Sequence, residues 1–551
     1  MNPPPIARAA LILALGNLGS RILGLGREQV IAGLFGATTA TDAFRVAFRV
    51  PMALYDLLVG GMISSALVPV FSGYLARGER RELGRMVSTL LSLLVLALTA
   101  IVLFLITSAP LLVRFIAAGY PNDVQSLSAD LLRTILPALV FMGVSAILTA
   151  ALYAQQRFGL PALSVMAFNI GIVAAAVPLH GQMGIASLAV GVLVGAGLQV
   201  LLQLPGMRGQ GLQLLVDLTH PGVWQSARLY LPVALGLVVS TVGIAIDTNL
   251  ASHTGAGNLA AMGFATTLVQ FPLGMVAAAV SSAVLPSLSR HARAFTHEDT
   301  MQAATQQGVQ AEGPVSLDED SVTSNASPEE STRAFRETLA LGLKLVLLTI
   351  IPATLALLAL REHVVRLLFQ RGAFDALATQ RTSTAFLAYS PGLPAAAIDQ
   401  VLIFGYYARG KTLPPVLVGV LSVGVYVALA VALLGPLGMP GLALANSAQW
   451  VSHMVVMLAL THRSTGGLDG LGLLATLGRA SLSSGAMLAV VLCGLTFSVA
   501  DVNTGTLKLA ASLSGLMGLG AAAYFGTLAV TGRSDLRLLA SALFRRFAKE
   551  G

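Results

Sequence analysis

Four arginines and three acids lie in or beside apolar stretches of the sequence, where lipid would exclude charge. A charged group inside a membrane span costs several kcal/mol unless it faces a water-filled cavity or a partner, so each is a functional candidate. Arg45 and Arg49 are four residues apart, which places them on one helical face. The group comprises Arg21, Arg27, Asp42, Arg45 and Arg49 near the N terminus, with Asp247 and Asp399 further along.

The N-terminal arginines suit an anionic ligand such as a diphosphate. Arginine stays ionised at physiological pH, and its planar fork makes paired charge-assisted hydrogen bonds. The alternative is that Arg27 and Arg49 extend to the membrane surface and that Asp42 is a helix cap paired with a neighbour. Arg21 would then have to reach about one and a half turns past several glycines. The cluster therefore favours an anionic substrate.

Asp247 and Asp399 lie deeper in their apolar stretches. A buried carboxylate can hold a proton or bind a sodium ion with neighbouring oxygens, so both are candidates for cation or proton coupling. The alternative is a carboxylate satisfied by polar neighbours. No phosphate-binding loop and no His-Glu-x-x-His occurs, and the single cysteine, Cys493, excludes a cysteine-based zinc site. We expect no enzyme, no metal site and no cofactor.

The composition indicates which elements position these residues. Of 551 residues, 55% are hydrophobic and only 11% charged, against about 25% charged in a soluble domain. Long charge-free runs predict an all-α polytopic membrane protein, and they lack the short alternating segments of a β-barrel. Fourteen helices are predicted, at 8–26, 43–72, 86–110, 130–154, 160–179, 184–205, 228–251, 258–289, 338–360, 380–408, 413–434, 439–461, 475–499 and 507–531.

The distribution of Lys and Arg predicts the orientation, because these residues concentrate in cytoplasmic loops. Alternate connections are basic, as at 77–85, or nearly free of positive charge, as at 180–181, which places both termini in the cytoplasm. One connection breaks the rule, with Arg361, Arg366, Arg371 and Arg381 on the outer side. An amphipathic surface helix is the preferred explanation there, and a miscounted span is the alternative. The basic loops fit anionic lipids better than nucleic acid.

Two passages of the sequence look like copies of one another. Pro51 and then Ser64-Ser65-Ala66-Leu67-Val68-Pro69 correspond to Pro272 and then Ser281-Ser282-Ala283-Val284-Leu285-Pro286. The offset equals six helices, so the repeat is parallel, as in transporters that bind substrate between two lobes. The predicted organisation is an N-terminal lobe at 1–210, a C-terminal lobe at 220–465 with a polar disordered linker at 291–335, two added helices at 470–531 and a basic tail at 532–551.

Several of these motifs closely resemble the MurJ (MviN) family of lipid II flippases in the MOP exporter superfamily. They are Ser20-Arg21-Ile22-Leu23-Gly24-Leu25-Gly26-Arg27-Glu28, Phe35-Gly36-Ala37, Thr41-Asp42-Ala43-Phe44, Ala47-Phe48-Arg49-Val50-Pro51, Phe271-Pro272, Arg371-Gly372-Ala373-Phe374 and Tyr406-Tyr407-Ala408-Arg409-Gly410. The resemblance implies alternating-access transport of lipid II across a bacterial inner membrane. It further implies that Arg21, Arg27 and Asp42 line the cavity, and that the lipid tail follows a groove along the two added helices.

The sequence departs from the family at two places. Tyr55 and Asp56 stand where relatives often have an arginine pair, and Thr267 stands near a basic position of helix eight. The cavity has therefore lost positive charge, in part replaced by Arg45. A flippase for another polyprenyl-linked oligosaccharide, a cation-coupled exporter and a membrane scaffold that recruits cell-wall enzymes through the linker remain alternatives.

Overall fold

The computed structural model describes residues 5–57, 61, 63–208, 213, 215–217, 219–283, 288, 328–498 and 505–544. Every regular element among them is helical. Ten helical segments of this part are long and apolar enough to cross a membrane. The remaining four predicted spans are also helical, as α1, the α2 to α3 region, α9 and α10. The chain is an all-α polytopic membrane protein, as the sequence predicts.

Two compact units make up the chain, and each is described separately. The first comprises Met1–Phe264 with Leu368–Thr382, and the second comprises Ala265–Leu367 with Ser383–Gly551. The predicted lobes divide the chain near residue 215 instead. The structure groups α9 with the N-terminal unit because α9 packs on α2, α3 and α4. The six-helix lobes therefore remain a prediction.

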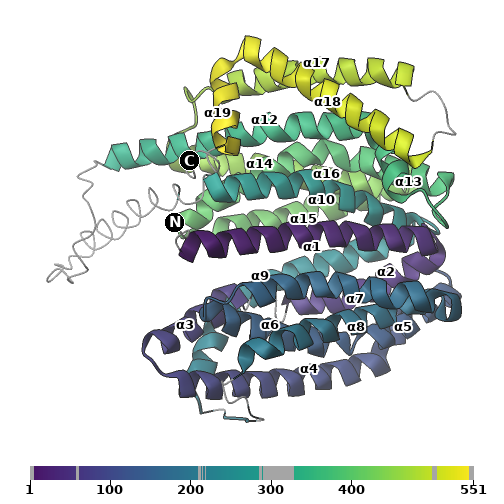
Figure 1. Cartoon of the computed structure of the whole chain (residues 1–551), viewed down its shortest axis with the longest axis vertical. Helices are drawn as coiled ribbons and strands as arrows, with labels where there is room; N and C mark the ends of the chain where they lie inside the picture. The colour runs from purple at the N-terminus through teal and green to yellow at the C-terminus, as the bar shows by residue number, and fades with distance from the viewer. Residues whose placement is uncertain are drawn as a thin grey trace. The chain divides into compact units, whose positions relative to one another are not determined.

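The first unit is a bundle in which neighbouring helices in sequence pack side by side, most extensively α7 with α8 (Figure 1). Gly16 and Gly19 let α1 approach α7, since a Cβ at Gly16 would lie 2.5 Å from the Ala162 Cβ. The elements of this unit are α1 (Pro5–Phe35), α2 (Thr39–Tyr55), the π-helix η2 (Ile63–Leu67), α3 (Val68–Ala76), α4 (Arg80–Ile116), α5 (Asn122–Ile135), α6 (Ala138–Ala154), α7 (Gly159–Met183), α8 (Ala186–Gln203), η3 (Leu204–Met207), α9 (Pro221–Ser252) and the start of α10 (Asn258–Ala283).

Three tight turns of this unit meet at one end of its helices. Gly36 follows α1 with φ +65°, and a Cβ there would lie 2.3 Å from the Ala373 carbonyl oxygen. Gly257 and Gly372 also have positive φ, and each would place a Cβ within 2.2 Å of a carbonyl oxygen, that of Ala37 and of Gly33 respectively. The Ala373 amide donates to the Gly33 carbonyl at 2.9 Å. Only glycine allows these backbones to approach so closely.

The second unit is built around the long helix α12, against which α14, α16, α17, α18 and α19 contribute buried apolar side chains. The Tyr524 hydroxyl of α18 donates to the Leu348 carbonyl of α12 at 2.7 Å. Its elements are the rest of α10, nearly all of α12 (Pro328–Phe369), the second half of α13 (Ala376–Tyr389), η4 (Ser390–Gly392), α14 (Leu393–Ala408), α15 (Leu413–Leu437), α16 (Met439–Thr465), α17 (Leu473–Ser498), α18 (Thr506–Thr531) and α19 (Arg533–Phe544).

Some segments differ from the sequence prediction. The connection after α12 holds no separate surface helix, because α12 continues unbroken for 42 residues to Phe369 and carries Arg361 and Arg366 on its last turns. Residues 291–327 of the predicted linker lie outside the described residues, whereas α12 begins at Pro328, a favoured first position of a helix. The predicted tail forms α19 up to Phe544.

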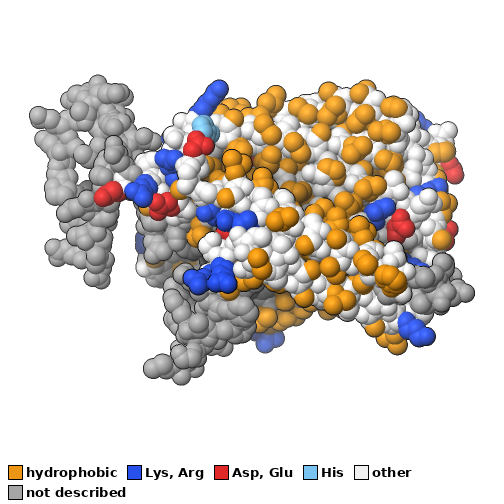
Figure 2. Space-filling model, turned by 90° about the horizontal axis from the view of Figure 1, so that it is seen from above, with side chains coloured by type: hydrophobic (Ala, Val, Ile, Leu, Met, Phe, Trp, Pro, Cys, Tyr) orange, Lys and Arg blue, Asp and Glu red, His pale blue; other side chains and the backbone are white. Residues whose placement is uncertain are grey.

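The space-filling view in Figure 2 agrees with a membrane setting. On the face shown, hydrophobic side chains spread over the middle, and Lys and Arg gather toward the two ends. Large apolar side chains such as Leu474, Phe497, Leu507 and Val530 are more than 80% exposed. Such a surface is stable in contact with lipid and would associate in water.

Candidate functional site

The turn between α1 and α2 sets the charged side chains of the two helices opposite each other. Thr38 caps α2 with its hydroxyl oxygen, which accepts from the Thr41 amide at 3.4 Å. The chain reverses within a few residues after Gly36, so the end of α1 faces the start of α2. This places Arg27 and Glu28 within reach of Arg45, which is 17 residues from Glu28 in sequence.

Glu28 joins two of the predicted arginines. Its Oε1 accepts from Arg27 Nη2 at 2.8 Å, and its Oε2 accepts from Arg45 Nη2 at 2.6 Å. Glu28 is 5% exposed, and the Arg27 and Arg45 side chains are 20% and 16% exposed. The Arg45 guanidinium also lies over the Phe264 ring, 4.8 Å from its centroid. Two positive charges and one negative charge leave this group with a net positive charge.

The Arg27 and Arg45 guanidiniums retain donors beyond their bonds to Glu28. The Nε of each is buried and has no hydrogen-bond partner in the structure. A guanidinium has five N–H donors, and a phosphate oxygen accepts from them with good geometry. The pair therefore offers unused donors and excess positive charge in one place, which is the chemistry that an anionic group requires.

Arg49 is held by α9. Its Nη1 donates to Asp247 Oδ2 and to the Thr248 hydroxyl, both at 2.8 Å. The Arg49 and Asp247 side chains are each 27% exposed. A residue predicted to bind substrate is thus paired with a residue predicted to couple cations, although 198 positions separate them. Asp247 in this arrangement is a partnered carboxylate, the alternative that the sequence left open.

Asp42 is fully buried and caps another helix. Its Oδ2 accepts from the Gly257 amide at 2.5 Å and its Oδ1 from the Ala260 amide at 2.7 Å. The Gly257 amide immediately precedes α10 and the Ala260 amide lies in its first turn, so Asp42 faces a helix N-terminus, which attracts negative charge. The carboxylate therefore fixes the α9–α10 turn against α2. This position favours a structural cap over direct contact with a substrate.

Arg21 stands apart from the Glu28 group. Its side chain is exposed on α1. Six residues separate it from Arg27, which is about 9 Å along the helix and about 240° around it. The two side chains therefore do not share a helical face. The structure brings Arg27 and Arg45 together through Glu28 and places Arg49 on α9, but it does not add Arg21 to the pair.

Asp399 of the second unit has a partner that the sequence prediction did not name. Its Oδ1 lies 2.8 Å from His453 Nδ1, and the two side chains are 14% and 13% exposed. His453 lies within the apolar helix α16, and an ionisable residue there was a signal that could have been used. Glu28 was missed in a similar way, because its position next to Arg27 suggested only the end of a helix.

The two positions at which the sequence departs from the family are both helical. Tyr55 is the last residue of α2, half-buried beside the exposed Asp56. Thr267 is half-buried within α10. Neither place carries a basic side chain in the described structure. The positive charge of the N-terminal region comes from the α1 and α2 arginines.

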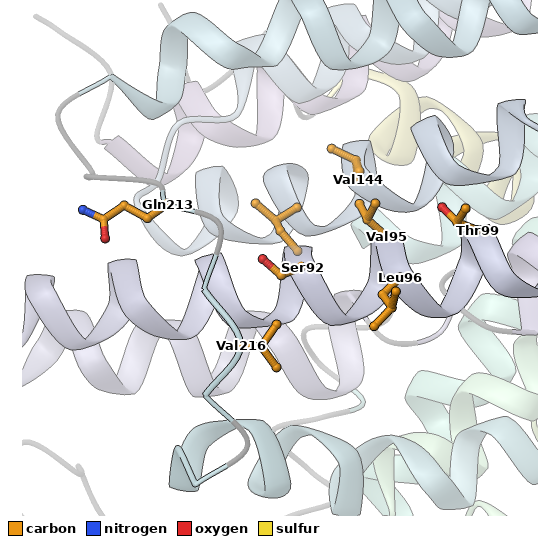
Figure 3. Close-up of a pocket in the computed structure, with 8 residues that line it drawn as sticks. Ser92, Val95, Leu96, Thr99, Val144, Gln213 and Val216 are labelled. Atoms are coloured by element: carbon orange, nitrogen blue, oxygen red, sulfur yellow. The ribbon is translucent and has the colours of Figure 1, made fainter.

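A groove of about 630 Å³ lies on α4 in the first unit (Figure 3). The connection after α8 crosses it and is held there by Ser92 Oγ, which accepts from the Leu215 amide at 3.2 Å. Arg85 pairs with Asp217 of the same connection, and a hydrogen bond from Thr219 lowers the pKa of Asp217. Leu91, Val95, Leu96 and Val144 make the lining mainly apolar. The groove therefore does not suit a diphosphate.

Comparison with solved structures shows which known proteins share this fold. A chain described as "Lipid II flippase MurJ, inward closed conformation" superposes with a TM-score of 0.73 at 22% identity, covering 98% of this chain and all of that one. An inward-facing multidrug resistance MATE family transporter of the MOP superfamily gives a TM-score of 0.62 at 12% identity, covering 82% of this chain and 95% of its own. The chain shares the polytopic helical fold of these two proteins.

Sequence comparison then shows the family. The family model "Lipid II flippase MurJ" matches residues 31–316 and 321–511. The lipid II flippase MurJ of Burkholderia cenocepacia is 30% identical over 429 residues, 76% of each chain. A probable lipid II flippase MurJ of Vibrio cholerae is 27% identical over 96% of each chain. The chain belongs to the MurJ family.

Proposed function

We propose that this protein is a lipid II flippase that carries the undecaprenyl-diphosphate-linked peptidoglycan precursor from the inner to the outer leaflet by alternating access. The family assignment supports the cargo. The observation that supports the chemistry is the buried Arg27–Glu28–Arg45 group, with two Nε donors still free. This inference extends to the bacterial inner membrane as the location, with both termini cytoplasmic.

Glu28 gives the group a means of exchanging partners. A carboxylate and a phosphate make the same type of bond with a guanidinium, and a diphosphate carries more charge. In this proposal the diphosphate takes the Nη donors of Arg27 and Arg45 from Glu28 and uses their Nε donors as well. When the cargo leaves, Glu28 returns and prevents the two guanidiniums from repelling one another. Arg21 would meet the cargo from the exposed side of α1, whereas Arg49 takes no part because Asp247 already pairs with it.

Alanine substitutions of the arginines test this proposal. Arg27→Ala and Arg45→Ala are expected to abolish rescue of a strain depleted of its own lipid II flippase, while the variant still inserts into the membrane. Arg21→Ala is expected to do the same, because in this proposal the exposed arginine takes part in capturing the anion. The matched control is Arg133→Ala, since the Arg133 side chain is 41% exposed and pairs with Asp130 at 2.9 Å. Wild-type growth with Arg27 and Arg45 both replaced would refute the assignment.

The identity of the cargo needs its own measurement. Depletion of the protein should raise lipid II in the inner leaflet, measured by the accessibility of the precursor to an external probe. Unchanged lipid II with loss of a surface polysaccharide would instead identify another polyprenyl-linked oligosaccharide as cargo. The cargo is in question because Tyr55 and Thr267 are uncharged at places where relatives carry basic residues.

Recruitment of cell-wall enzymes is tested separately. A scaffold that acts through the linker predicts that deleting residues 291–327 abolishes function while leaving α12, which begins at Pro328, unaltered. A flippase predicts that the deletion variant still supports growth and still moves lipid II. Growth without lipid II movement would favour the scaffold.

A further inference from the structure

A histidine and an aspartate of the second unit form a pair within the membrane-spanning part of the chain. His453 of α16 and Asp399 of α14 approach to 2.8 Å, with 13% and 14% of their side chains exposed. Asp399 lies nine residues before the end of α14, and His453 lies twelve residues before the end of α16. Both therefore lie about 13 to 18 Å inside their helices. An ionisable pair at this depth indicates a function.

Both ring nitrogens of His453 face oxygen atoms. Nδ1 faces Asp399 Oδ1, and Nε2 lies 3.4 Å from the Pro415 carbonyl of α15. A neutral imidazole carries one N–H and can donate to only one of these acceptors, whereas an imidazolium donates to both. The geometry therefore matches the doubly protonated ring. In that state, His453 connects α16 to α14 and to α15 simultaneously.

Few other charges surround the pair. Helix α15 carries no Asp, Glu, Lys, Arg or His, and Tyr426 is its only titratable side chain. Helix α14 carries Asp399 together with Tyr406 and Tyr407. On α16 the remaining titratable groups, His462 and Arg463, lie at least nine residues from His453, about 13 Å along the helix. Among these three helices, Asp399 is thus the charged group in contact with His453.

The ligand that suits this pair is a proton and not a metal cation. Sodium is bound by several oxygen atoms, and a ring N–H directed at a carboxylate oxygen occupies one of the few that are present. Histidine is the side chain whose charge changes between about pH 5 and about pH 8. Loss of the proton from His453 would remove one of its two hydrogen bonds. The contact of α16 with either α14 or α15 would then weaken.

We propose that His453 and Asp399 form a proton-binding site whose occupancy sets the packing of α16 against α14 and α15 and thereby the rate of transport. This proposal rests on the proposed flippase function for its effect on rate, but not for the proton binding itself. Asp399 acts by orienting and charging His453, and neither side chain contacts the cargo in this scheme. His453 is the proton acceptor.

The experiment uses the full chain purified into liposomes, with infrared difference spectra recorded between about pH 5.5 and about pH 8. The wild type is expected to show imidazole and carboxylate bands that change together, and transport of a fluorescent lipid II analogue that changes with pH. His453→Gln and Asp399→Asn should remove the coupled bands and flatten the pH dependence of transport. His462→Gln, an exposed histidine of the same helix, should leave the coupled bands and the pH dependence unchanged.

The two readouts separate failure of this proposal from failure of the proposed function. Coupled bands without any transport by the wild type would support proton binding and count against the flippase. Two results would overturn the proton site. One is transport that keeps its pH dependence in His453→Gln, and the other is spectra in which the His453 and Asp399 bands do not change together. If His453→Gln fails to fold, Asp399→Asn carries the same test, because the amide still accepts from Nδ1 but carries no charge.

Discussion

Glu28 is the residue on which the N-terminal charge cluster depends. Its carboxylate bonds two arginines at 2.8 and 2.6 Å, and it is 5% exposed. The cluster is therefore stable without a ligand and remains positive overall. A site of this kind can be assembled during folding and still attract an anion afterwards, which a pair of unmatched guanidiniums in an apolar setting could not do.

We predict that Glu28→Gln destabilises the protein by about 3 kcal/mol, because removing one partner of a buried ion pair leaves charge unmatched. The measurement is the midpoint of thermal unfolding in detergent. The control is Glu82→Gln, since Glu82 is 45% exposed and pairs with Arg85 at 3.4 Å, where a change below about 1 kcal/mol is expected. Equal midpoints for Glu28→Gln and wild type would mean that the pairing contributes nothing.

We predict that Asp42→Asn costs about 2 kcal/mol. In the variant, one of the two oxygens that accept hydrogen bonds from the Gly257 and Ala260 amides is replaced by an NH₂ group, which is a donor and faces another donor. The negative charge that stabilises the N-terminus of α10 is also lost. Faster hydrogen exchange in the first turn of α10 reports this. Asp123→Asn, an exposed first-turn residue of α5, should leave α10 unchanged. Lost cargo binding with normal α10 exchange would instead assign Asp42 to the cavity.

The sequence revealed which residue types carry chemistry but not their partners. Intramembrane charge is visible in any sequence, so Arg27, Arg45, Asp247 and Asp399 could be selected from it. Partners separated by 198 residues, as for Arg49 and Asp247, depend on how helices pack, and helical periodicity carries no information about that. His453 was overlooked because a single histidine in an apolar helix resembles a core residue until its neighbour is known.

At the scale of elements, the meeting of three turns positions α1, α2 and α10. Gly36, Gly257 and Gly372 allow backbones to approach to distances that a side chain would block. The cluster residues lie on the helices that leave these turns. The two family motifs that contain Gly36 and Gly372 thus have a packing explanation in this chain.

We predict that Gly372→Ala lowers the free energy of unfolding by about 3 kcal/mol. Roughly 1 kcal/mol of this is the cost of holding an alanine at positive φ. The clash of its Cβ with the Gly33 carbonyl accounts for about 2 kcal/mol more. Gly410→Ala is the matched control, because Gly410 has φ +69° and nothing within 4 Å of an added Cβ. Gly410→Ala should lower the free energy of unfolding only by the cost of positive φ, roughly 1 kcal/mol. Thermal unfolding of both variants measures the difference, and equal costs would show that the turns relax without penalty.

Prolines explain where the predicted helices and the observed ones disagree. The segment 130–154, predicted as one helix, is divided at Pro137 between α5 and α6, and the segment 380–408 is interrupted at Ser390–Gly392. Proline lacks the amide that continues a helix. Yet Pro51 lies within α2 and Pro272 within α10, so tertiary packing decides which prolines break a helix. Helix α4 extends beyond its predicted ends, because hydropathy identifies the apolar residues that cross the membrane and not the polar turns that continue the helix on either side.

At the scale of the whole molecule, the predicted orientation follows from the basic connections. His180, in the last turn of α7, and His253, directly after α9, are exposed beside connections almost free of positive charge, and Lys411 and Arg463 are exposed near basic ones. The same rule places the α12 to α13 turn on the outer side despite Arg371. The long α12 explains that exception, since 42 residues extend about 63 Å, well beyond a hydrocarbon core of about 30 Å. Its terminal arginines can therefore lie beyond the hydrocarbon core, at the outer surface.

Single cysteines test this orientation in a chain whose own cysteine is removed. Cys493 is the only cysteine and is exposed on α17, so Cys493→Ala gives a background without thiols. His180→Cys and His253→Cys should react with a membrane-impermeant maleimide added to intact cells, because their connections face outward in the predicted topology. Lys411→Cys and Arg463→Cys should react only after the cells are opened, because the excess of Lys and Arg retains those connections in the cytoplasm. Labelling of His253→Cys and Lys411→Cys from the same side would contradict the helix count between them.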